Sequence, residues 1–532
     1  MQAVFTKNGS ETPEPVKHDS FFSCVCLHPG AIPDWLQGTL VRNGPGLFNI
    51  GDTAYNHWFD GMALLHNFTF KDGDVYYRSK FLQSETFKRN TGANRIVVSE
   101  FGTMVYPDPC KNIFSKAFTY FSNAIPDFTD NNLVNIIRYG EDYYAASEVN
   151  YINKIDPHTL ETVGRTNYRN HIALNLATAH PHYDEEGNTY NMGTAIIGFG
   201  RPKYMIFKVP ADASDKKKPA MSKVEKVCSI PFRSSLYPSY FHSFGMTENY
   251  IVFVEQAFKL DIFKLATAYF RGVNWGSCLK YDKDDMTYFN LINRKTGKAV
   301  STKFYGDPFV VFHHINAFEE DGHVVFDLIT YKDSNLYDMF YIENMRQDTD
   351  KFVENNKIFS PPVCQRFVLP ITVDKDTPVG TNLVTLKDTS AKAVIEKDGS
   401  VFCSPDTLFV GLELPQINYK FNTKKYRYFY GSRVEWSPHP NKIAKVDIVT
   451  RTHQEWRDEE CYPSEPVFVA SPDAVEEDDG VLLSSVVSLN PAKSPFMLVL
   501  NAKTMEEIAR ASVDASIHMD LHGYFIPQKD SN

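Results

Sequence analysis

Four short stretches of this chain share one turn pattern: Lys154-Ile-Asp-Pro-His-Thr159, Leu291-Ile-Asn-Arg-Lys-Thr296, Lys445-Val-Asp-Ile-Val-Thr450 and Val499-Leu-Asn-Ala-Lys-Thr504. In each, an apolar strand end is followed by Asp or Asn, two further residues and a Thr. An Asp or Asn side chain accepts the backbone N–H two residues ahead, so the pattern predicts a turn between adjacent strands. Four copies favour a radial β repeat over chance recurrence of a common turn. The natural architecture for such a repeat is a β-propeller of four to eight blades.

The other segments also fit an all-β chain. The stretches 250–255, 323–330 and 480–488 are rich in β-branched or aromatic residues and are bounded by Gly, Asn, Asp or Pro, as strands are. The chain has 40 Phe and 29 Tyr, an aromatic content that suits strands and apolar cavities. Helical periodicity is scarce, and no Gly/Ser linker divides the chain. We therefore expect one domain over 21–532, preceded by a flexible tail over 1–20.

Composition and charge narrow the class of protein. With 532 residues, 43% hydrophobic and 23% charged, the chain is expected to bury a large core. A formal charge of -10 argues against a nucleic-acid partner. The N-terminus lacks a charged start followed by an apolar run, and no stretch of about 18 apolar residues predicts a membrane-spanning helix. Eight cysteines in so long a chain predict reduced thiols and a cytosolic location.

Histidines recur at equivalent places in the repeat. His180, His242 and His313 each precede a turn and a strand, at steps of 62 and 71 residues. His522 follows 209 residues later, close to three steps of about 70, which corresponds to roughly seven blades in the whole chain. Equivalent positions on inner strands point at the axis of a propeller, so these imidazoles are expected to converge. Four neutral imidazoles suit Fe, Cu, Ni or Zn. Spacing alone leaves the flanking His182, His314 and His518 as alternatives.

Three glutamates lie in apolar or proline-bounded contexts: Glu148, Glu413 and Glu465. A buried carboxylate without a partner is costly, and a metal-bound histidine usually donates its second N–H to a carboxylate or carbonyl. We expect these glutamates to lie behind the candidate metal ligands. The alternative for each is an outward residue on an alternating strand.

At these residues the sequence resembles the carotenoid cleavage oxygenase family, and the resemblance extends from about Pro33 to Phe525. The matching motifs include Arg42-Asn-Gly-Pro-Gly46, Glu100-Phe-Gly-Thr103, Ala179-His-Pro-His182, His242-Ser-Phe-Gly245, Phe312-His-His-Ile-Asn316, Pro463-Ser-Glu-Pro466 and Leu521-His-Gly523. The resemblance implies a seven-bladed β-propeller with helices and loops doming one face over a non-haem Fe(II). It also implies four iron ligands at His180, His242, His313 and His522, with Glu148, Glu413 and Glu465 behind them.

Within the family, the stretch 249–269 looks most like the branch that cleaves the central 15,15′ double bond of β-carotene with O2 to give two molecules of retinal. Eccentric 9′,10′ cleavage, or a retinoid isomerohydrolase acting on retinyl esters, is the alternative. Tyr240, two residues before His242, is a candidate for the wall of the substrate cavity, as are Phe101 and Tyr331. Ordinary core packing is the alternative for all three. Val149 stands where relatives tend to carry a hydroxyl residue.

A lipophilic substrate implies access from a lipid surface. The stretches 112–121 and 257–270 have helical apolar spacing, and in the second Phe258, Ile262, Leu265 and Tyr269 share one face. Such helices can lie in a membrane interface, but a core-facing helix has the same pattern. We expect a cytosolic protein. Peripheral membrane contact through these two stretches is one interpretation of the pattern, and packing against the core is the other. Cys110 matches a position that can carry a lipid in the isomerohydrolase branch.

Overall fold

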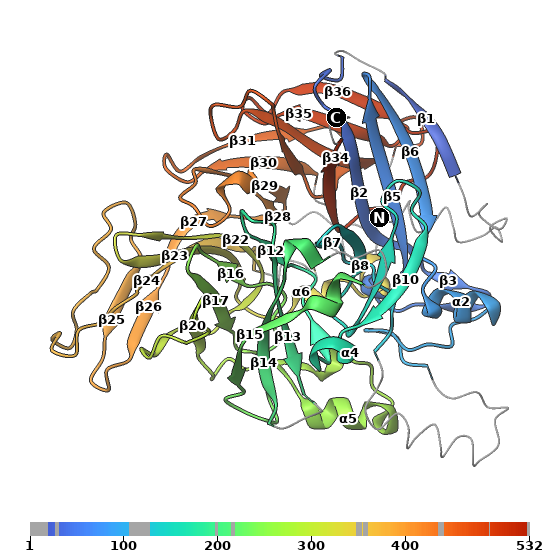
Figure 1. The fold of residues 1–532 in the computed structure, drawn as a ribbon. Helices are drawn as coiled ribbons and strands as arrows, with labels where there is room; N and C mark the ends of the chain where they lie inside the picture. Colours follow the sequence, from blue (N-terminus) through green and yellow to red (C-terminus); the bar gives the residue numbers. More distant parts are fainter. Residues whose placement is uncertain are drawn as a thin grey trace.

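The structure is a computed structural model in which the strands form blades around a common centre (Figure 1). It describes the residues 20–26, 31–105, 128–196, 201–213, 219–346, 354, 360–434, 441–488 and 490–528. Apart from Ser20, the predicted tail 1–20 lies outside the described residues, and the boundaries 1–20 and 21–532 stay predictions.

The described strands form seven blades, as predicted, and the two ends of the chain close the ring. The first blade has the order β1 (Ser20–Cys26), β6 (Asp74–Phe81), β5 (Met62–Lys71), β2 (Gly38–Leu47) and β37 (His522–Pro527). Strand β37 comes from the C-terminal end and pairs antiparallel with β2, so that His522 lies opposite Asn43. Strand β1 pairs with the seventh blade through Val25 and Ser512, and this pairing joins the first and last blades in one sheet.

The other six blades follow in chain order. The second is β7 (Asn135–Tyr139), β8 (Asp142–Ala146), β9 (Tyr151–Ile155) and β10 (Thr162–Asn167); the third is β11 (Leu176–Ala177), β12 (His182–Tyr183), β13 (Thr189–Ala195), β14 (Lys203–Val209) and β15 (Glu225–Pro231). The fourth is β16 (Gly245–Met246), β17 (Tyr250–Glu255), β20 (Thr287–Asn293) and β21 (Phe304–Gly306), extended by the hairpin β25 (Lys392–Ile395) and β26 (Val401–Ser404). The fifth is β22 (Val310–Glu320), β23 (His323–Tyr331), β24 (Val363–Pro370) and β27 (Asp406–Val410); the sixth is β28 (Leu412–Gln416), β29 (Tyr428–Arg433), β30 (Lys442–Asp447) and β31 (Thr452–Arg457). The seventh is β32 (Cys461–Pro463), β33 (Val467–Ala470), β34 (Gly480–Ser488), β35 (Phe496–Asn501) and β36 (Glu507–Ser512).

The turn pattern that predicts the repeat has the expected hydrogen bonds in all four places. The Oδ1 atoms of Asp156, Asn293, Asp447 and Asn501 each accept two backbone N–H groups, those of the second and third residues ahead. Each turn joins adjacent strands of one blade: β9 to β10, β20 to β21, β30 to β31 and β35 to β36. The prediction of strand-connecting turns is confirmed.

The hydrophobic core lies between the blades. Seven clusters of buried apolar side chains each join two neighbouring blades. Between the fourth and fifth blades, for example, Phe326 and Phe367 stack with ring centroids 5.5 Å apart, and Phe289 packs against both. Strand β23 is buried along its whole length because both of its faces meet a neighbour. With apolar burial satisfied between blades, the centre of the ring is left for polar side chains.

Short helices and two small sheets cover part of the propeller. Insertions within the fourth blade supply β18 (Phe258–Leu260), α5 (Ile262–Arg271), η4 (Gly276–Cys278) and β19 (Leu279–Tyr281), and an insertion within the fifth supplies α6 (Leu336–Met339) and α7 (Ile342–Met345). The remaining elements are β3 (Asn49–Ile50), β4 (Thr53–Ala54), η1 (Trp58–Asp60), α2 (Glu85–Gly92), α4 (Arg169–Ile172), η2 (Ala211–Ala213), η3 (Ala220–Lys223) and η5 (Tyr419–Phe421). Residues of η1, α5 and α6 line one apolar cavity, as expected for a dome over one face.

Candidate metal centre

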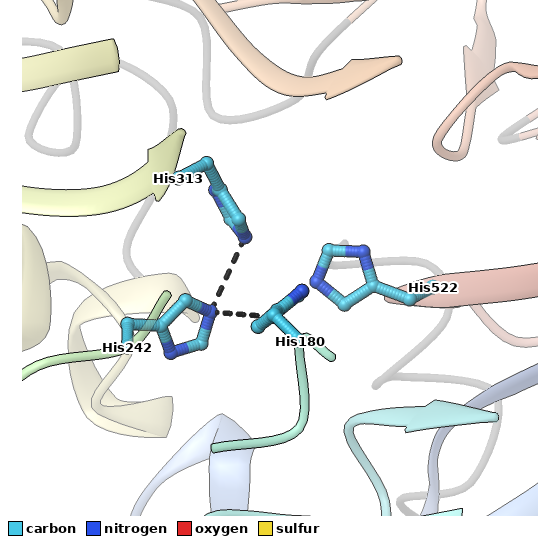
Figure 2. A group of neighbouring side chains, drawn as sticks. All are labelled: His180, His242, His313 and His522. Carbon is cyan, nitrogen blue, oxygen red and sulfur yellow. Dashed lines mark hydrogen bonds between the residues drawn. The ribbon is translucent and has the colours of Figure 1, made fainter. Parts of the chain in front are cut away.

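Four histidines from four blades point toward one another (Figure 2). One ring nitrogen of each of His180, His242, His313 and His522 lies within 4.8 Å of the others. The Nε2 atoms of His180 and His242 are 2.8 Å apart, and those of His242 and His313 are 3.2 Å apart. We call these four side chains the histidine cluster. The structure thus brings together all four predicted ligands, although 342 residues of sequence separate the first from the last.

A β-bulge aims the third histidine at the cluster. Strand β22 pairs with β23 with register shifts between Val311 and His314 and again between His314 and Asn316. A bulge inserts an extra residue and redirects side chains that simple alternation would place on opposite faces. His313 and its neighbour His314 can therefore both lie near the centre of the ring.

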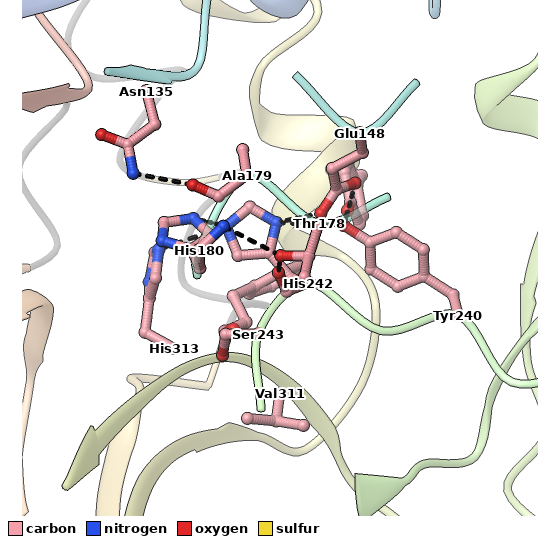
Figure 3. Close-up of polar contacts among 12 residues, drawn as sticks. Asn135, Glu148, Thr178, Ala179, His180, Tyr240, His242, Ser243, Val311 and His313 are labelled. Atoms are coloured by element: carbon pink, nitrogen blue, oxygen red, sulfur yellow. Dashed lines mark hydrogen bonds and ion pairs between the residues drawn. The ribbon is translucent and has the colours of Figure 1, made fainter. Parts of the chain in front are cut away.

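Local hydrogen bonds fix the loops that carry the first two histidines (Figure 3). Thr178 Oγ1 donates to the carbonyl of His242 and accepts the backbone N–H of His180 at 3.0 Å. Asn135 Nδ2 donates to the Ala179 carbonyl at 2.8 Å. These bonds tie the segment 178–180 both to the second blade and to the segment that bears His242.

Each predicted glutamate contacts one histidine of the cluster. His242 Nδ1 lies 2.5 Å from Glu148 Oε1, His313 Nδ1 lies 2.6 Å from Glu413 Oε2, and His522 Nδ1 lies 2.8 Å from Glu465 Oε1. A carboxylate only accepts hydrogen bonds, so the imidazole proton belongs on Nδ1 and the lone pair on Nε2. For His242 and His313, two Nε2 lone pairs then face each other at 3.2 Å. Such an arrangement repels unless a cation lies between the nitrogens, so this donor set fits a metal ion.

Tyrosines and amides complete the hydrogen bonding of the carboxylates. Tyr240 Oη donates to Glu148 Oε2 at 2.8 Å, and Tyr331 Oη donates to Glu413 Oε1 at 2.7 Å. Gln416 Nε2 donates to Glu465 Oε1 at 2.8 Å. A buried carboxylate held from both sides keeps its orientation and hence that of the imidazole it contacts.

Burial and neighbouring groups favour the neutral form of His180 and the ionised forms of Glu413 and Glu465. Burial, reinforced by the other three imidazoles, holds the pKa of His180 well below its usual value. Burial alone would raise the pKa of Glu413, but the charge and hydrogen bond of His313, with further hydrogen bonds, lower it overall. The pKa of Glu465 is lowered in the same way by His522. Neutral imidazole is the form that ligates a metal.

The three flanking histidines lie outside the cluster. His182 Nε2 contacts the Phe244 carbonyl at 2.7 Å, and His314 Nδ1 contacts Ser243 Oγ at 2.9 Å. Burial, together with the charges of His182 and His313, lowers the pKa of His314 to about 3. Burial lowers the pKa of His518 to about 4, and this side chain lies near His66 and Asp520 instead.

An apolar cavity of about 350 Å³ reaches the histidine cluster. Its walls include all three predicted cavity residues, Phe101, Tyr240 and Tyr331, and also Val149, which puts an apolar side chain on the cavity surface. Three histidines of the cluster and two of the glutamates line it: His242, His313 and His522, with Glu148 and Glu413.

Tyr337 is a cavity residue that sequence reasoning missed. Its Oη donates to Tyr240 Oη at 3.0 Å, and its ring lies 5.3 Å from that of Phe312. Leu414 is a second such residue, and it has a positive φ of 53°, where a non-glycine residue is strained. Tyr337 lies in the four-residue helix α6, and neither position carries a periodic signal that could have identified it.

A second cavity, of about 980 Å³, approaches the cluster along a different set of residues. Its lining contains several polar side chains, among them Asn135, Ser243, His314, Gln416 and Asn422. We call it the polar cavity and the first one the apolar cavity.

The stretch 257–270 is only partly helical, and two residues of its expected common face, Phe258 and Leu265, point inward. Phe258 belongs to strand β18 and is buried, and Leu265 of α5 is buried as well. Among the described side chains of α5, the exposed large apolar ones are Phe263 and Phe270, with exposed fractions of 60% and 61%. Lys259, the neighbour of Phe258, is also buried and pairs with Asp285 at 2.7 Å.

The other stretch predicted to contact a membrane, 112–121, lies outside the described residues, as does Cys110. Within the part of the chain that the structure describes, no helix has the length and apolar character needed to span a bilayer.

Fold and site together define a class: seven-bladed propellers with four imidazoles at the centre, three of them backed by carboxylates. The family model described as retinal pigment epithelial membrane protein matches residues 14–527, and the chain belongs to this family, which includes the carotenoid oxygenases. It is 57% identical to β,β-carotene 15,15′-dioxygenase of Mus musculus, over 100% of this chain and 93% of that one. It is 58% identical to the Gallus gallus protein of the same name, over 100% and 99%. It is 43% identical to the mitochondrial carotenoid-cleaving dioxygenase of Homo sapiens, over 94% and 87%.

Solved structures of low sequence identity share the fold. A cobalt-substituted form of the Synechocystis apocarotenoid oxygenase superposes with a TM-score of 0.76 at 21% identity, covering 99% of each chain. A mutant of the same oxygenase gives 0.76 at 20% identity, also over 99% of each chain.

Proposed function

We propose that this protein is an Fe(II)-dependent dioxygenase that cleaves the central 15,15′ double bond of β-carotene. The observation that carries the proposal is the histidine cluster at the end of an apolar cavity, in a chain 55–58% identical to relatives named β,β-carotene 15,15′-dioxygenase. In the reaction the C15=C15′ bond breaks and each carbon gains one atom of the same O2. The products are two molecules of retinal, so no external reductant is needed.

In this proposal His180, His242, His313 and His522 hold the metal through Nε2. Glu148, Glu413 and Glu465 keep the proton on Nδ1 of their histidines and offset the charge of a divalent ion. A bound ferrous ion would supply the redox-active centre for the reaction with O2. The resemblance to carotenoid oxygenases, rather than the ligand set alone, supports iron over zinc.

The apolar cavity would bind and align the polyene. Aromatic faces at Phe101 and Tyr337, whose rings lie 5.5 Å apart, can contact the conjugated chain next to the cluster. Such faces favour positive character on a bound polyene by about 0.5–2 kcal/mol each. The hydroxyl groups of Tyr240 and Tyr331 donate hydrogen bonds to Glu148 and Glu413. These tyrosines therefore present their rings, rather than a free O–H, to the substrate.

Product identification tests this function most directly. The metal-loaded protein incubated with β-carotene and O2 should give retinal as the sole cleavage product, and apocarotenals would instead indicate eccentric cleavage. Conversion should stop under anaerobic conditions, whereas an isomerohydrolase acting on retinyl esters would continue. His242→Ala should lose both metal and activity; full retinal formation by this variant would contradict the assigned ligand.

We also propose peripheral membrane contact through α5, with a cytosolic location. Four of the ten exposed large hydrophobic residues in the described part of the chain gather here: Leu236, Tyr237, Phe263 and Phe270. The Ile262 N–H donates to the Leu236 carbonyl at 3.0 Å, which holds the two segments together. The opposite face of α5 lines the apolar cavity through Leu265, so a lipid-bound helix would lie next to the substrate site.

Liposome flotation tests this contact. The double variant Phe263→Asp, Phe270→Asp should lose most of its binding to neutral liposomes, and cleavage of detergent-solubilised β-carotene should remain. The matched control is Val379→Asp, which removes an equally exposed apolar residue elsewhere on the surface. Equal flotation of all three proteins would contradict the contact.

A further inference from the structure

The histidine cluster separates the two cavities. Of the residues lining either cavity, only His313 and His522 belong to both. His180 lines the polar cavity alone, and His242 lines the apolar cavity alone. The histidine cluster can therefore be reached from two cavities, one lined mainly by apolar side chains and one by several polar side chains.

The two approaches suit different species. The apolar cavity is walled mainly by aromatic and aliphatic side chains, which suit a polyene and repel a hydrated ion. The polar cavity reaches the surface at Tyr419, which has an exposed fraction of 45%, and at exposed Lys420. A divalent cation keeps its water or finds replacement donors along such a wall, so its desolvation is far less unfavourable there.

On the wall of the polar cavity, His314 has a ring nitrogen, Nε2, that is free to bind a metal ion. Ser243 Oγ donates to the Phe312 carbonyl at 2.5 Å, so it can only accept from His314, whose backbone N–H and Nδ1 lie 3.1 and 2.9 Å away. The proton of His314 is thereby placed on Nδ1 and the lone pair on Nε2. This Nε2 is buried and has no hydrogen-bond partner among the described residues. The same tautomer is found in the histidines of the cluster that contact glutamates.

We propose that the metal ion enters and leaves the histidine cluster through the polar cavity, and that His314 Nε2 binds the ion in transit before it reaches His313. The inference rests on the proposed metal-binding role of the cluster. It assigns separate entrances to the metal and to the polyene. His314 is a transfer ligand in this scheme, and the final coordination does not include it.

A transfer role changes rates without changing affinity. His314→Asn retains a side-chain donor near the Nδ1 position for Ser243 and removes Nε2. We expect Co²⁺ to load onto the metal-free variant at least about fivefold more slowly than onto the unsubstituted protein. Visible absorbance in a stopped-flow instrument measures the loading rate. Removal of Co²⁺ from the loaded variant by excess chelator should slow by the same factor. The equilibrium affinity, and therefore the final absorbance at limiting Co²⁺, should stay unchanged.

A reversible plug tests the route independently of His314. Tyr419→Cys at the mouth of the polar cavity can be labelled with a bulky methanethiosulfonate reagent and released with a reductant. Labelling should slow both loading and removal of Co²⁺ about tenfold, and reduction should restore the rates. The unsubstituted chain treated with the same reagent controls for labelling of native cysteines.

A variant in the apolar cavity serves as the control for the route. Leu336→Trp should obstruct β-carotene cleavage and leave both Co²⁺ rates unchanged. Unchanged Co²⁺ rates in labelled Tyr419→Cys, or slowed rates in Leu336→Trp, would overturn the route. A lower Co²⁺ affinity in His314→Asn that comes from faster removal, with a normal loading rate, would assign it a supporting role instead of transfer. Failure of the unsubstituted protein to bind Co²⁺ would refute the proposed metal site itself, a distinct outcome.

Discussion

At the scale of single residues, hydrogen bonds decide which nitrogen of each imidazole is available. Glu413 shows this clearly because it accepts from His313 Nδ1, from Tyr331 Oη and from the N–H of Leu414 at 2.8 Å. With its acceptor sites used in this way, the carboxylate holds His313 in one tautomer and one orientation.

We predict that Glu413→Gln lowers metal affinity about 10- to 100-fold, because a neutral amide neither offsets the charge of the ion nor enforces an Nδ1 proton. Competition with a calibrated chelator measures the affinity. Glu319→Gln is the matched control: Glu319 lies on the same strand as His313 but accepts from Thr247 and Asn249 instead. Equal loss of affinity in both variants would contradict a specific role for Glu413.

At the scale of secondary-structure elements, the repeated Asx turns set where strands reverse. Asn293 Oδ1 accepts the N–H groups of Lys295 and Thr296 at 3.1 and 2.9 Å, and these bonds satisfy the two N–H groups where strand β20 ends. Asp occupies the equivalent place in the turns at Asp156 and Asp447, so the turn requires the acceptor rather than the amide.

We therefore predict that Asn293→Ala lowers the free energy of unfolding by about 1 kcal/mol, similar to the loss of a helix N-cap acceptor. Asn293→Asp should stay within about 0.5 kcal/mol of the parent protein. Urea unfolding followed by tryptophan fluorescence measures both. An alanine variant as stable as the aspartate variant would show that the side-chain acceptor is dispensable.

At the scale of the whole molecule, covering segments that come from distant parts of the chain, η1 and α6, are linked by a buried polar bridge. His57 is fully buried: its Nδ1 accepts the Phe59 N–H at 3.1 Å, and its Nε2 contacts the Tyr337 carbonyl at 2.9 Å. Burial lowers the pKa of His57 from 6.5 to about 4. The folded chain therefore excludes a proton that the unfolded chain takes up below pH 6.5, and stability falls as the pH drops from about 6.5 toward 4.

We predict that His57→Asn makes stability less dependent on pH. Asn is a good N-cap and can still accept the Phe59 N–H, but it does not titrate. Between about pH 6 and 4.5 the free energy of unfolding should fall less steeply than in the parent protein, by up to about 1.4 kcal/mol per pH unit. Urea unfolding at several pH values tests this, and parallel pH profiles for the two proteins would contradict it.

The sequence alone determined the features that depend on neighbouring residues. Asx turns need only an acceptor and the next N–H groups, and the recurrence of His180, His242 and His313 before equivalent turns follows from the repeat itself. From these, a propeller with a central group of imidazoles could be predicted, and the acids at Glu148, Glu413 and Glu465 could be singled out by their apolar surroundings.

Only the tertiary structure decided the features that depend on contacts between distant segments. The pairing of β37 with β2 carries His522 to the first blade, and the bulge in β22 brings both His313 and His314 inward. The inward face of α5 and the place of Tyr337 on the cavity wall depend on what packs against them. No local pattern encodes the separation of two cavities by the histidine cluster, because it arises only when blades from the whole chain meet.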